Sequence, residues 1–293
     1  VDMAEYVYEP FADTEEYRQV NESIVRDWIE TIVGAGTRQI GRVLDLATGV
    51  GTMVQIFLDN LPTGWKQPAV TCVDQSQEAL EIAGKRLRPR VAKLELVQSS
   101  IEDMNVPENS VDLAMWGNGI HYLDEESQER ALRNVRRALK PGGWFFFNSA
   151  FSAESRPPES LPFYRAQIGN AVRKLKELGA KREKQERPNA STFQDRDHYQ
   201  LLLQRVGFAV RDLHKVAARL YKSAWENISG FSQYAAGALH GYRPDIAAKA
   251  LREAVAPSLE QHGLRDEKGN LYIPRDWLSA AARLDEGPRA SHV

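Results

Sequence analysis

A glycine-containing turn that follows an apolar run constrains the fold of this chain more than any other segment. The run Val43–Leu46 contains one acid, Asp45, and continues as Ala47-Thr48-Gly49-Val50-Gly51-Thr52. This pattern is typical of a strand, a tight turn and a helix, and glycine lets a ligand approach the backbone of the turn. A dinucleotide-binding turn would have glycine or alanine where this chain has Val54. A pyrophosphate is therefore not the favoured ligand.

A second apolar run also ends in an acid. Ala69–Val73 leads into Asp74, and a helix is expected from Gln77. Because the carboxyl ends of adjacent parallel strands lie side by side, Asp74 is placed to bind both hydroxyls of a ribose beside the glycine turn. Asp74 or Ser76 would equally cap the helix from Gln77. The two roles are compatible, with Ser76 capping and Asp74 binding.

The run Asp45–Thr52 resembles the first motif of class I S-adenosylmethionine-dependent methyltransferases, whose ligand carries a sulfonium, an ammonium and a carboxylate. Further landmarks follow in the family's order over residues 43 to 148. They are Asp74 after the second strand, Ser99–Met104 after the third, Gly117–Leu123 after the fourth, and the turn Lys140-Pro141-Gly142-Gly143 before the fifth, which is expected to begin at Trp144.

The resemblance implies a set of cofactor-binding residues along one edge of the sheet. Where the family has an aspartate that holds the adenine, this chain has the shorter Ser100, followed by Ile101, which can offer its amide and its side chain. The set comprises Asp45, Ala47, Thr48, Gly49, Gly51, Thr52, Asp74, Gln75, Ser100, Ile101, Trp116 and Gly117.

An N-terminal segment adds two further candidates by the same resemblance. In many small-molecule methyltransferases a tyrosine-bearing N-terminal segment closes over the cofactor, which suggests Tyr8 and Tyr17 for S-adenosylmethionine binding. Simple packing of an amphipathic helix from about Thr14 to Val33 explains Tyr17 as well.

Two catalytic candidates follow the fourth strand. In the family this strand end faces the transferred methyl group. His121 is a candidate base or orienter of the acceptor, because an imidazole titrates near physiological pH. A packing role for His121 stays open. Asn118 is a candidate to position the acceptor or the ammonium of the cofactor.

The implied fold class is α/β, a Rossmann-like doubly wound and mostly parallel seven-stranded sheet with helices on both faces and a helical lid or cap insertion. Methyl transfer benefits from such a cover, which excludes water. The expected organisation is an N-terminal helical lid segment at 1–38, the cofactor-binding core at 39–150, a helical lid insertion at 151–195, a return to the core at 196–222, a helical acceptor-pocket insertion at 223–272, and a final strand and tail at 273–293.

The first insertion contains a basic stretch, Arg165 to Arg187. Apolar residues recur in it at helical spacing, which predicts an amphipathic helix with one buried stripe. Its cationic face is a solvated surface, a device that steers an anionic acceptor, or a lid over the acidic N-terminal segment. The stripe comprises Ala171, Val172, Leu175 and Leu178.

The second insertion, Ser223 to Gly263, is rich in aromatic residues ahead of a regular helix at Pro244 to His262. These residues form either ordinary core or an acceptor pocket for a hydrophobic or ring-containing molecule. They are Trp225, Phe231, Tyr234, Leu239 and Tyr242.

Composition agrees with a globular protein. With 293 residues and 42% hydrophobic content the chain can bury a sizeable core, and a net charge of -2 gives no global attraction to nucleic acid or anionic lipid. The single cysteine, Cys72, excludes an internal disulfide and is expected to be buried and inert. No run is long enough to span a bilayer and no basic leader precedes an apolar stretch, so cytoplasmic residence is expected.

The absence of other motifs argues against several enzyme classes. The sequence has no GxxxxGK[ST], HExxH, CxxC or GxSxG pattern. A metal at Asp195–His198 is disfavoured because acids are favourable at a helix start. We therefore expect S-adenosylmethionine as cofactor, no metal, and methyl transfer to a small, hydrophobic or aromatic acceptor. A non-methyl reaction of the same ligand, such as cyclisation or attack on the aminobutyl chain, and a noncatalytic binding protein stay open, as does a homodimer.

Overall fold

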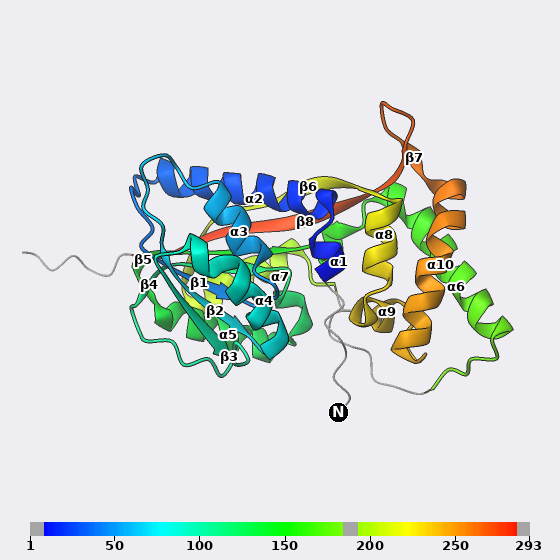
Figure 1. The fold of residues 1–293 in the computed structure, drawn as a ribbon, viewed down its shortest axis with the longest axis horizontal. Helices are drawn as coiled ribbons and strands as arrows, with labels where there is room; N and C mark the ends of the chain where they lie inside the picture. The colour runs from blue at the N-terminus through cyan, green and yellow to red at the C-terminus, as the bar shows by residue number, and fades with distance from the viewer. Residues whose placement is uncertain (1–8, 184–192, 286–293) are drawn as a thin grey trace, which may run out of the picture. The chain divides into compact units, whose positions relative to one another are not determined.

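The computed structural model describes residues 9–183 and 193–285, and these divide into two compact units (Figure 1). The sheet unit contains residues 21–149, 194–215 and 278–285. The helical unit contains residues 9–20, 150–183, 193 and 216–277. The cofactor-binding residues expected from 45 to 117 therefore all lie in the sheet unit.

The sheet is mostly parallel, in the order β3-β2-β1-β4-β5-β8-β6, and the two-residue β7 pairs with β8 outside this order. Parallel pairing joins β1 to β2 and β4, β2 to β3, and β4 to β5, whereas β8 is antiparallel to β5. The predicted fold class is confirmed; β7 adds a short strand to the seven expected. The strands are β1 (Arg42–Leu46), β2 (Ala69–Asp74), β3 (Lys93–Gln98), β4 (Val111–Gly117), β5 (Leu139–Ser149), β6 (Phe208–Tyr221), β7 (Leu264–Arg265) and β8 (Leu271–Leu284).

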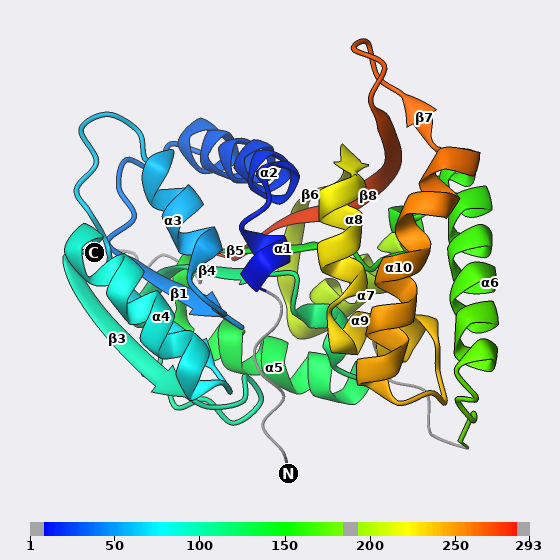
Figure 2. The same ribbon diagram turned by 45° about the vertical axis from the view of Figure 1, so that its right-hand side comes forward.

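Helices of the sheet unit cover both faces of its strands. Figure 2 shows α3 and α4 on one side of the strands and α5 on the other. The helices and 3-10 turns of this unit are most of α2 (Glu15–Gly34), α3 (Thr52–Asp59), α4 (Gln77–Leu87), η1 (Arg88–Arg90), η2 (Ile120–Tyr122), α5 (Glu125–Ala138) and α7 (Arg196–Val206).

Alternate residues of β5 build the two cores. On the face covered by α2, the ring of Trp28 stacks on Phe146 with centroids 5.1 Å apart. On the opposite face Phe145 and Phe147 belong to a buried cluster with residues of α5 and α7, including Tyr199, whose ring lies 5.1 Å from that of Phe147. The two-residue period of a strand thus explains an unbroken apolar run, because both faces are buried.

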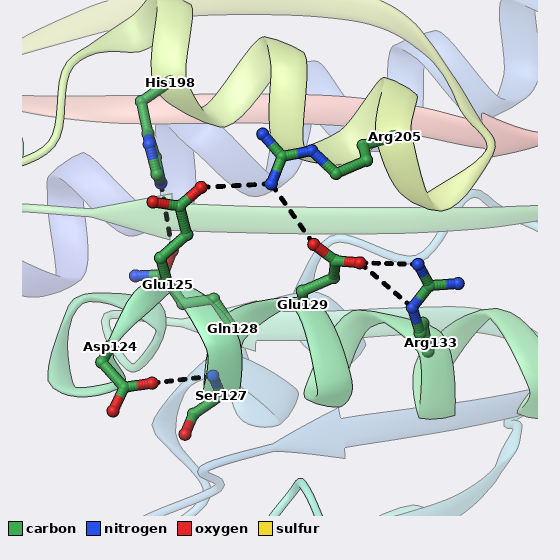
Figure 3. A network of polar contacts seen from close by, with 8 residues as sticks. All are labelled: Asp124, Glu125, Ser127, Gln128, Glu129, Arg133, His198 and Arg205. Atoms are coloured by element: carbon green, nitrogen blue, oxygen red, sulfur yellow. Dashed lines mark hydrogen bonds and ion pairs between the residues drawn. The ribbon is translucent and has the colours of Figure 1, made fainter.

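The α5–α7 surface, defined by residues 124–133 of α5 and 198–205 of α7, carries a charge network (Figure 3). Arg205 donates to Glu125 at 3.1 Å and to Glu129 at 3.3 Å, and Glu129 also accepts from Arg133 at 2.6 Å. Asp124 caps α5 by accepting from the Ser127 amide at 2.8 Å. Every carboxylate drawn in this network has a partner.

The helical unit contains two long helices, α6 and α10, and several short ones. α6 and α10 lie side by side in both views (Figures 1 and 2). Among the described residues, no helix combines the length and apolar composition that crossing a bilayer requires. The elements are α1 (Glu9–Ala12), η3 (Ala153–Ser155), η4 (Pro158–Ser160), α6 (Leu161–Glu177), α8 (Lys222–Ser229), α9 (Ser232–Ala238) and α10 (Pro244–His262).

Three local expectations need correction. The Lys140–Gly143 segment is not a turn before β5 but part of it, because a bulge opposite Val111–Leu113 and the positive φ of 78° at Gly142 absorb the extra residues. The final strand begins at Leu271, since β7 and β8 form a hairpin inside the segment expected to be helical. The helix α6 ends at Glu177, and Leu178 is 61% exposed instead of buried.

Candidate functional site

The turn after β1 changes direction through left-handed backbone conformations. The φ angles are 49° at Ala47, 54° at Gly49 and 84° at Gly51. The Thr48 amide donates to the Val73 carbonyl at 3.1 Å, which ties the turn to β2, and the Gly51 amide donates to the Thr48 carbonyl at 3.0 Å. A left-handed alanine is strained, so the surrounding structure must hold this turn in place.

Gly51 is required for close packing between the turn after β1 and the helix α4. It stands directly before α3, and a Cβ at this position would lie 3.1 Å from Leu87 Cδ1 and 3.4 Å from Ala83 Cβ, both on α4. Its positive φ also disfavours any other residue. The spacing of the two glycines therefore has a structural cause in addition to the expected ligand.

Asp74 joins the tip of β2 to the glycine turn. Its Oδ2 accepts from the Gly49 amide and its Oδ1 accepts from the Ser76 amide, both at 2.8 Å. Ser76 in turn caps α4, because its hydroxyl accepts from the Ala79 amide at 3.1 Å. The predicted capping role of Ser76 is thus confirmed, whereas the predicted binding role of Asp74 stays a prediction. Each oxygen of the Asp74 carboxylate retains capacity to accept a further hydrogen bond.

Asp45 is a buried carboxylate whose Oδ2 has no hydrogen-bond partner among the described residues. It is paired in register with Cys72 of β2 and Met115 of β4, so the three side chains share one face of the sheet. Burial raises the pKa of Asp45 to about 7; the Thr48 hydroxyl opposes this shift, and the negative charge of Asp74 adds to it. A buried carboxylate with one oxygen left without a partner is stabilised by a cation.

Cys72 is buried and free, as expected. Burial raises the pKa of its thiol, and the negative charge of Asp45 acts in the same direction. The thiol is therefore protonated at neutral pH and is not a nucleophile.

The end of β4 is held by a buried amide network. Asn118 has a positive φ of 48°, and its amide donates to both the carbonyl and the Oδ1 of Asn148 at 3.0 Å. Asn148 Nδ2 donates to Asn21 Oδ1 at 2.7 Å. Asn148 is fully buried, and it fixes the conformation of the predicted site residue Asn118.

The loops after β1 and β4 approach closely. A Cβ at Gly119 would clash with Trp116 Nε1 and would lie 2.9 Å from Ala47 Cβ, and a Cβ at Gly117 would lie 2.5 Å from Met53 Cγ. Trp116 itself is buried in the core cluster. The structure thus brings the predicted residues at the ends of β1 and β4 together.

His121 lies on the η2 turn and is 2% exposed. Its Nδ1 is 3.1 Å from the Ser149 hydroxyl, and its ring lies 4.2 Å from that of Tyr122. This bond to the end of β5 fixes the orientation of the imidazole.

The segment after β3 differs from what the sequence suggested. The Ser100 hydroxyl donates to Asp103 Oδ2 at 2.8 Å and accepts from the Asp103 amide at 3.1 Å, so it is engaged in its own turn. The side chain of Ile101 belongs to the buried core cluster, and its carbonyl accepts from Asn134 at 3.2 Å. These roles leave the Ile101 amide as the group suited to an adenine.

The remaining predicted residues have mixed surroundings. Thr52 begins α3 and is buried, with no partner for its hydroxyl among the described residues, whereas the side chain of Gln75 is exposed. Tyr8 lies outside the described residues. Tyr17 belongs to the helical unit and packs edge-on against Phe11 at 5.2 Å and Trp277 at 6.5 Å.

Sequence reasoning missed the supporting residues Asn21, Asn148 and Ser149. A polar pair, Asn148-Ser149, directly after four aromatic residues of β5 was the available signal, because polar side chains at a buried strand end need partners. Asp195 is confirmed as a helix cap, since its Oδ1 accepts from the His198 amide at 2.8 Å. Within the described ranges, no cluster of three or more His, Cys, Asp or Glu side chains is arranged to hold a metal.

Comparisons with known proteins agree with this geometry. Residues 43–143 match a family model described as a methyltransferase domain. A ubiquinone/menaquinone biosynthesis C-methyltransferase, UbiE, of Edwardsiella ictaluri is 35% identical over 140 residues, which are 46% of this chain and 54% of the relative. A malonyl-acyl-carrier-protein O-methyltransferase of Chlorobium phaeovibrioides is 28% identical over 131 residues, or 44% of this chain and 48% of the relative. The chain thus spans about half the length of these curated relatives.

Solved structures extend the likeness to most of the chain. The YcgJ protein of Bacillus subtilis superimposes with a TM-score of 0.53 at 15% identity, covering 89% of this chain and 99% of that one. The (4+2)-cyclase SpnF gives a TM-score of 0.53 at 17% identity, covering 92% of this chain and 82% of that one. At these identities the likeness shows a shared fold alone.

Proposed function

We propose that this protein transfers a methyl group from S-adenosylmethionine to a small-molecule acceptor, because residues 43–143 match a family model described as a methyltransferase domain and a 35% identical relative is a C-methyltransferase. The observation that carries the proposal is the buried carboxylate of Asp45, whose Oδ2 has no partner among the described residues, next to a glycine turn that Asp74 holds in place. A cation is the natural partner of such a carboxylate.

The residues of the sheet unit fit this cofactor. Asp45 would supply the negative charge that its ammonium and sulfonium require, and Asp74 would accept from the ribose hydroxyls while keeping its two amide donors. The Ile101 amide would donate to the adenine, and Thr52 would offer its unpartnered hydroxyl. When bound, S-adenosylmethionine supplies an electrophilic methyl group on a positively charged sulfur.

The chain's own contribution to chemistry is positioning. A neutral thioether is a good leaving group, so the protein has to align the acceptor with the methyl group and exclude water. Asn118 and His121 lie on the loop after β4, fixed by Asn148 and Ser149 respectively. We assign them to acceptor orientation, with His121 accepting a proton where the acceptor is a hydroxyl or an amine.

The helical unit is the proposed acceptor-binding part, and the lid role of its segments remains part of this proposal. Its aromatic residues suit a molecule with a hydrophobic or ring-containing body. We further propose cytoplasmic residence and leave a homodimer as a prediction.

Product analysis separates the proposal from its alternatives. The purified chain is titrated with S-adenosylmethionine by calorimetry, with NAD and ATP as controls, and mass spectrometry identifies any small molecule that it retains. With a retained acceptor, S-adenosylhomocysteine supports methyl transfer and methylthioadenosine indicates attack on the aminobutyl chain. Binding without any turnover would indicate a noncatalytic protein, and binding of NAD or ATP instead would overturn the cofactor assignment.

A further inference from the structure

Arg275 is a charged side chain in the interior of the helical unit. It lies on β8 and is 0% exposed. Its Nη1 donates to the Tyr164 hydroxyl at 2.6 Å and its Nη2 donates to the Ala150 carbonyl at 2.5 Å, while its buried Nε has no acceptor among the described residues. A buried guanidinium normally has a carboxylate partner, so this bonding pattern is incomplete.

The other neighbours of this guanidinium are aromatic rings. Its Cζ lies 4.8 Å from the ring centroid of Phe151 and 5.8 Å from that of Trp225. Both distances are in the range of cation–π attraction. The rings lower the cost of burying the charge, but they do not replace a hydrogen-bond acceptor for its Nε–H group.

A second arginine of the same unit has similar surroundings. Arg156 is half-buried, and its Cζ lies 4.1 Å from the ring centroid of Phe193 and 5.0 Å from that of Tyr164. Its Nε is buried and has no acceptor within the part of the chain that the structure describes. Tyr164 therefore contacts both guanidinium groups, through its ring and through its hydroxyl.

The two cations repel each other. Burial lowers the pKa of Arg156, and the positive charge of Arg275 acts in the same direction, while Tyr234 opposes the shift. Burial also raises the pKa of Tyr234 to about 12, so this phenol is neutral at physiological pH and supplies no counter-charge. Among the described residues, no carboxylate forms an ion pair with Arg156 or Arg275.

Other cations of the helical unit behave differently. Arg219 is paired with Glu267 at 2.7 Å, Lys174 with Glu253 at 2.6 Å and Arg243 with Asp245 at 2.9 Å. These pairs are on exposed side chains, where water would solvate the charge in any case. The unit thus pairs exposed cations, which need a partner least, while buried Arg275 and half-buried Arg156 have no anionic partner among the described residues.

We propose that Arg156 and Arg275 bind the oxyanion of a flat, unsaturated small molecule, whose body lies against the surrounding aromatic rings. The inference rests on the proposed function, since this molecule would be the methyl acceptor, and it narrows the acceptor class to organic anions. Half-buried Arg156 is the outer contact and Arg275 the inner one. The guanidinium fork matches a carboxylate or a phosphate, and both carry the same chemistry. The ring residues are Phe151, Tyr164, Phe193, Trp225 and Tyr234.

Three matched probes test the anion requirement on the full chain. Binding of trans-cinnamate, phenyl phosphate and the neutral cinnamamide is measured by calorimetry and thermal shift at one ionic strength. We expect at least one of the two anions to bind tenfold or more tightly than the amide, and the preferred anion identifies the kind of oxyanion. Equal affinity for the anions and the amide, or no binding of any probe, would overturn the proposal.

Variants test the residues. Arg156→Met keeps the apolar stem and removes the charge, and we expect it to lose tenfold or more in affinity for the preferred anion with cinnamamide unchanged. Arg219→Met is the matched control, because it removes an exposed, paired arginine of the same unit. Arg275→Lys keeps a charge but loses the fork, and it should weaken anion binding even where Arg275→Met does not fold. The proposal is wrong if Arg156→Met and Arg219→Met bind the anion equally well.

Measuring S-adenosylmethionine affinity in parallel keeps the two proposals distinct. Anion binding without any affinity for S-adenosylmethionine would contradict the methyltransferase function but support the anion site. Formation of S-adenosylhomocysteine with a neutral acceptor, and no preference for either anion, would contradict the anion site but support the methyltransferase function.

Discussion

The α5–α7 surface and the loop edge after β1 and β2 belong to the same unit, yet they treat charge in opposite ways. On the surface Glu129 accepts from two arginines, Arg133 and Arg205, whose hydrogen bonds lower its pKa (Figure 3). At the loop edge the buried Asp45 has an oxygen without a partner, and its pKa is raised. Complete pairing is typical of structural charge, whereas an unpaired buried carboxylate is typical of a site that a ligand completes.

The helical unit repeats this contrast with the opposite sign. Its exposed arginine Arg219 is paired, whereas its buried arginine Arg275 has no carboxylate partner among the described residues. A cation would neutralise the Asp45 carboxylate and an anion would neutralise the guanidinium groups, and these are the charges of the proposed sulfonium cofactor and the proposed anionic acceptor.

The largest effect is expected for Asp45→Asn. The pKa of Asp45 in the folded protein, about 7, lies above the usual value of 3.8 for an aspartic acid. The folded protein therefore holds the carboxyl proton of Asp45 more tightly than the unfolded chain does. The carboxyl therefore makes the wild type lose stability as the pH rises from about 4 to 7, by about 4 kcal/mol in total. Unfolding in urea at pH 4.5 and at pH 8 measures this effect. Between these two pH values, the unfolding free energy of the variant should rise relative to that of the wild type by an amount on the order of 4 kcal/mol.

The same variant should bind S-adenosylmethionine about 10- to 100-fold more weakly at pH 8, because a buried charge that faces a cation is lost. Wild-type affinity should also increase as the pH rises toward 7, and the variant should show no such rise. If the unfolding free energies of Asp45→Asn and the wild type were equal at both pH values, burial of the Asp45 charge would carry no cost. The loop edge would then not differ from the α5–α7 surface in how it holds charge.

Asp74→Ala should cost about 100-fold in affinity for S-adenosylmethionine. The change removes the acceptor for the Gly49 and Ser76 amides as well as the proposed ribose contact, so both the turn and the ligand lose partners. Calorimetry measures the loss. Asp103→Ala serves as the control, since that carboxylate bonds within its own turn at Ser100. Equal losses in the two variants would contradict the role of Asp74.

Asn148→Ala tests the buried amides that support the site. Removal of its side chain deletes the hydrogen bond to Asn21 Oδ1 and one acceptor of the Asn118 amide, which should lower the unfolding free energy by about 2 kcal/mol. A double-mutant cycle with Asn21→Ala should give a coupling energy on the order of 1 kcal/mol. Additive effects of the two changes would show that the pair does not act as a unit.

Local patterns predicted the strands well, because β1, β2 and β4 are buried apolar runs, with Asp45 near the end of β1, Asp74 at the end of β2 and Gly117 at the end of β4. The cofactor-binding role of these three residues stays a prediction. The helix Pro244–His262 and the cap Asp195 were also apparent, since proline at the first turn and an acid at the N-cap are local signals.

Long-range partners were not apparent from sequence. The bond between Asn21 and Asn148 joins residues 127 positions apart, and no local pattern encodes it. Arg275 lies in an apolar strand that was expected to begin at 273 and that begins at Leu271. Its partners Tyr164 and Ala150 come from other parts of the chain. An arginine inside a buried strand was the signal that such partners had to exist.

Ala47→Gly probes the strain of the loop edge by itself. An alanine at φ 49° is strained, and glycine relieves that strain at some cost in chain entropy, so a gain of up to about 1 kcal/mol in unfolding free energy is expected. Ala79→Gly, in the first turn of α4, is the matched control and should destabilise by up to about 1 kcal/mol. Changes of the same sign in both variants would show that strain does not distinguish the turn after β1.

The smallest effect is expected on the α5–α7 surface. Glu129→Gln removes a half-buried carboxylate at the surface whose exposed arginine partners are then solvated by water, so neither the thermal unfolding midpoint nor the affinity for S-adenosylmethionine should change measurably at physiological salt. At low salt a small loss of thermal stability should become visible, because screening of the ion pairs is weaker. Thermal unfolding at two salt concentrations and one calorimetric titration measure all three quantities. If Glu129→Gln weakened cofactor binding as strongly as Asp74→Ala, completeness of pairing would not separate structural charge from ligand-binding charge in this protein.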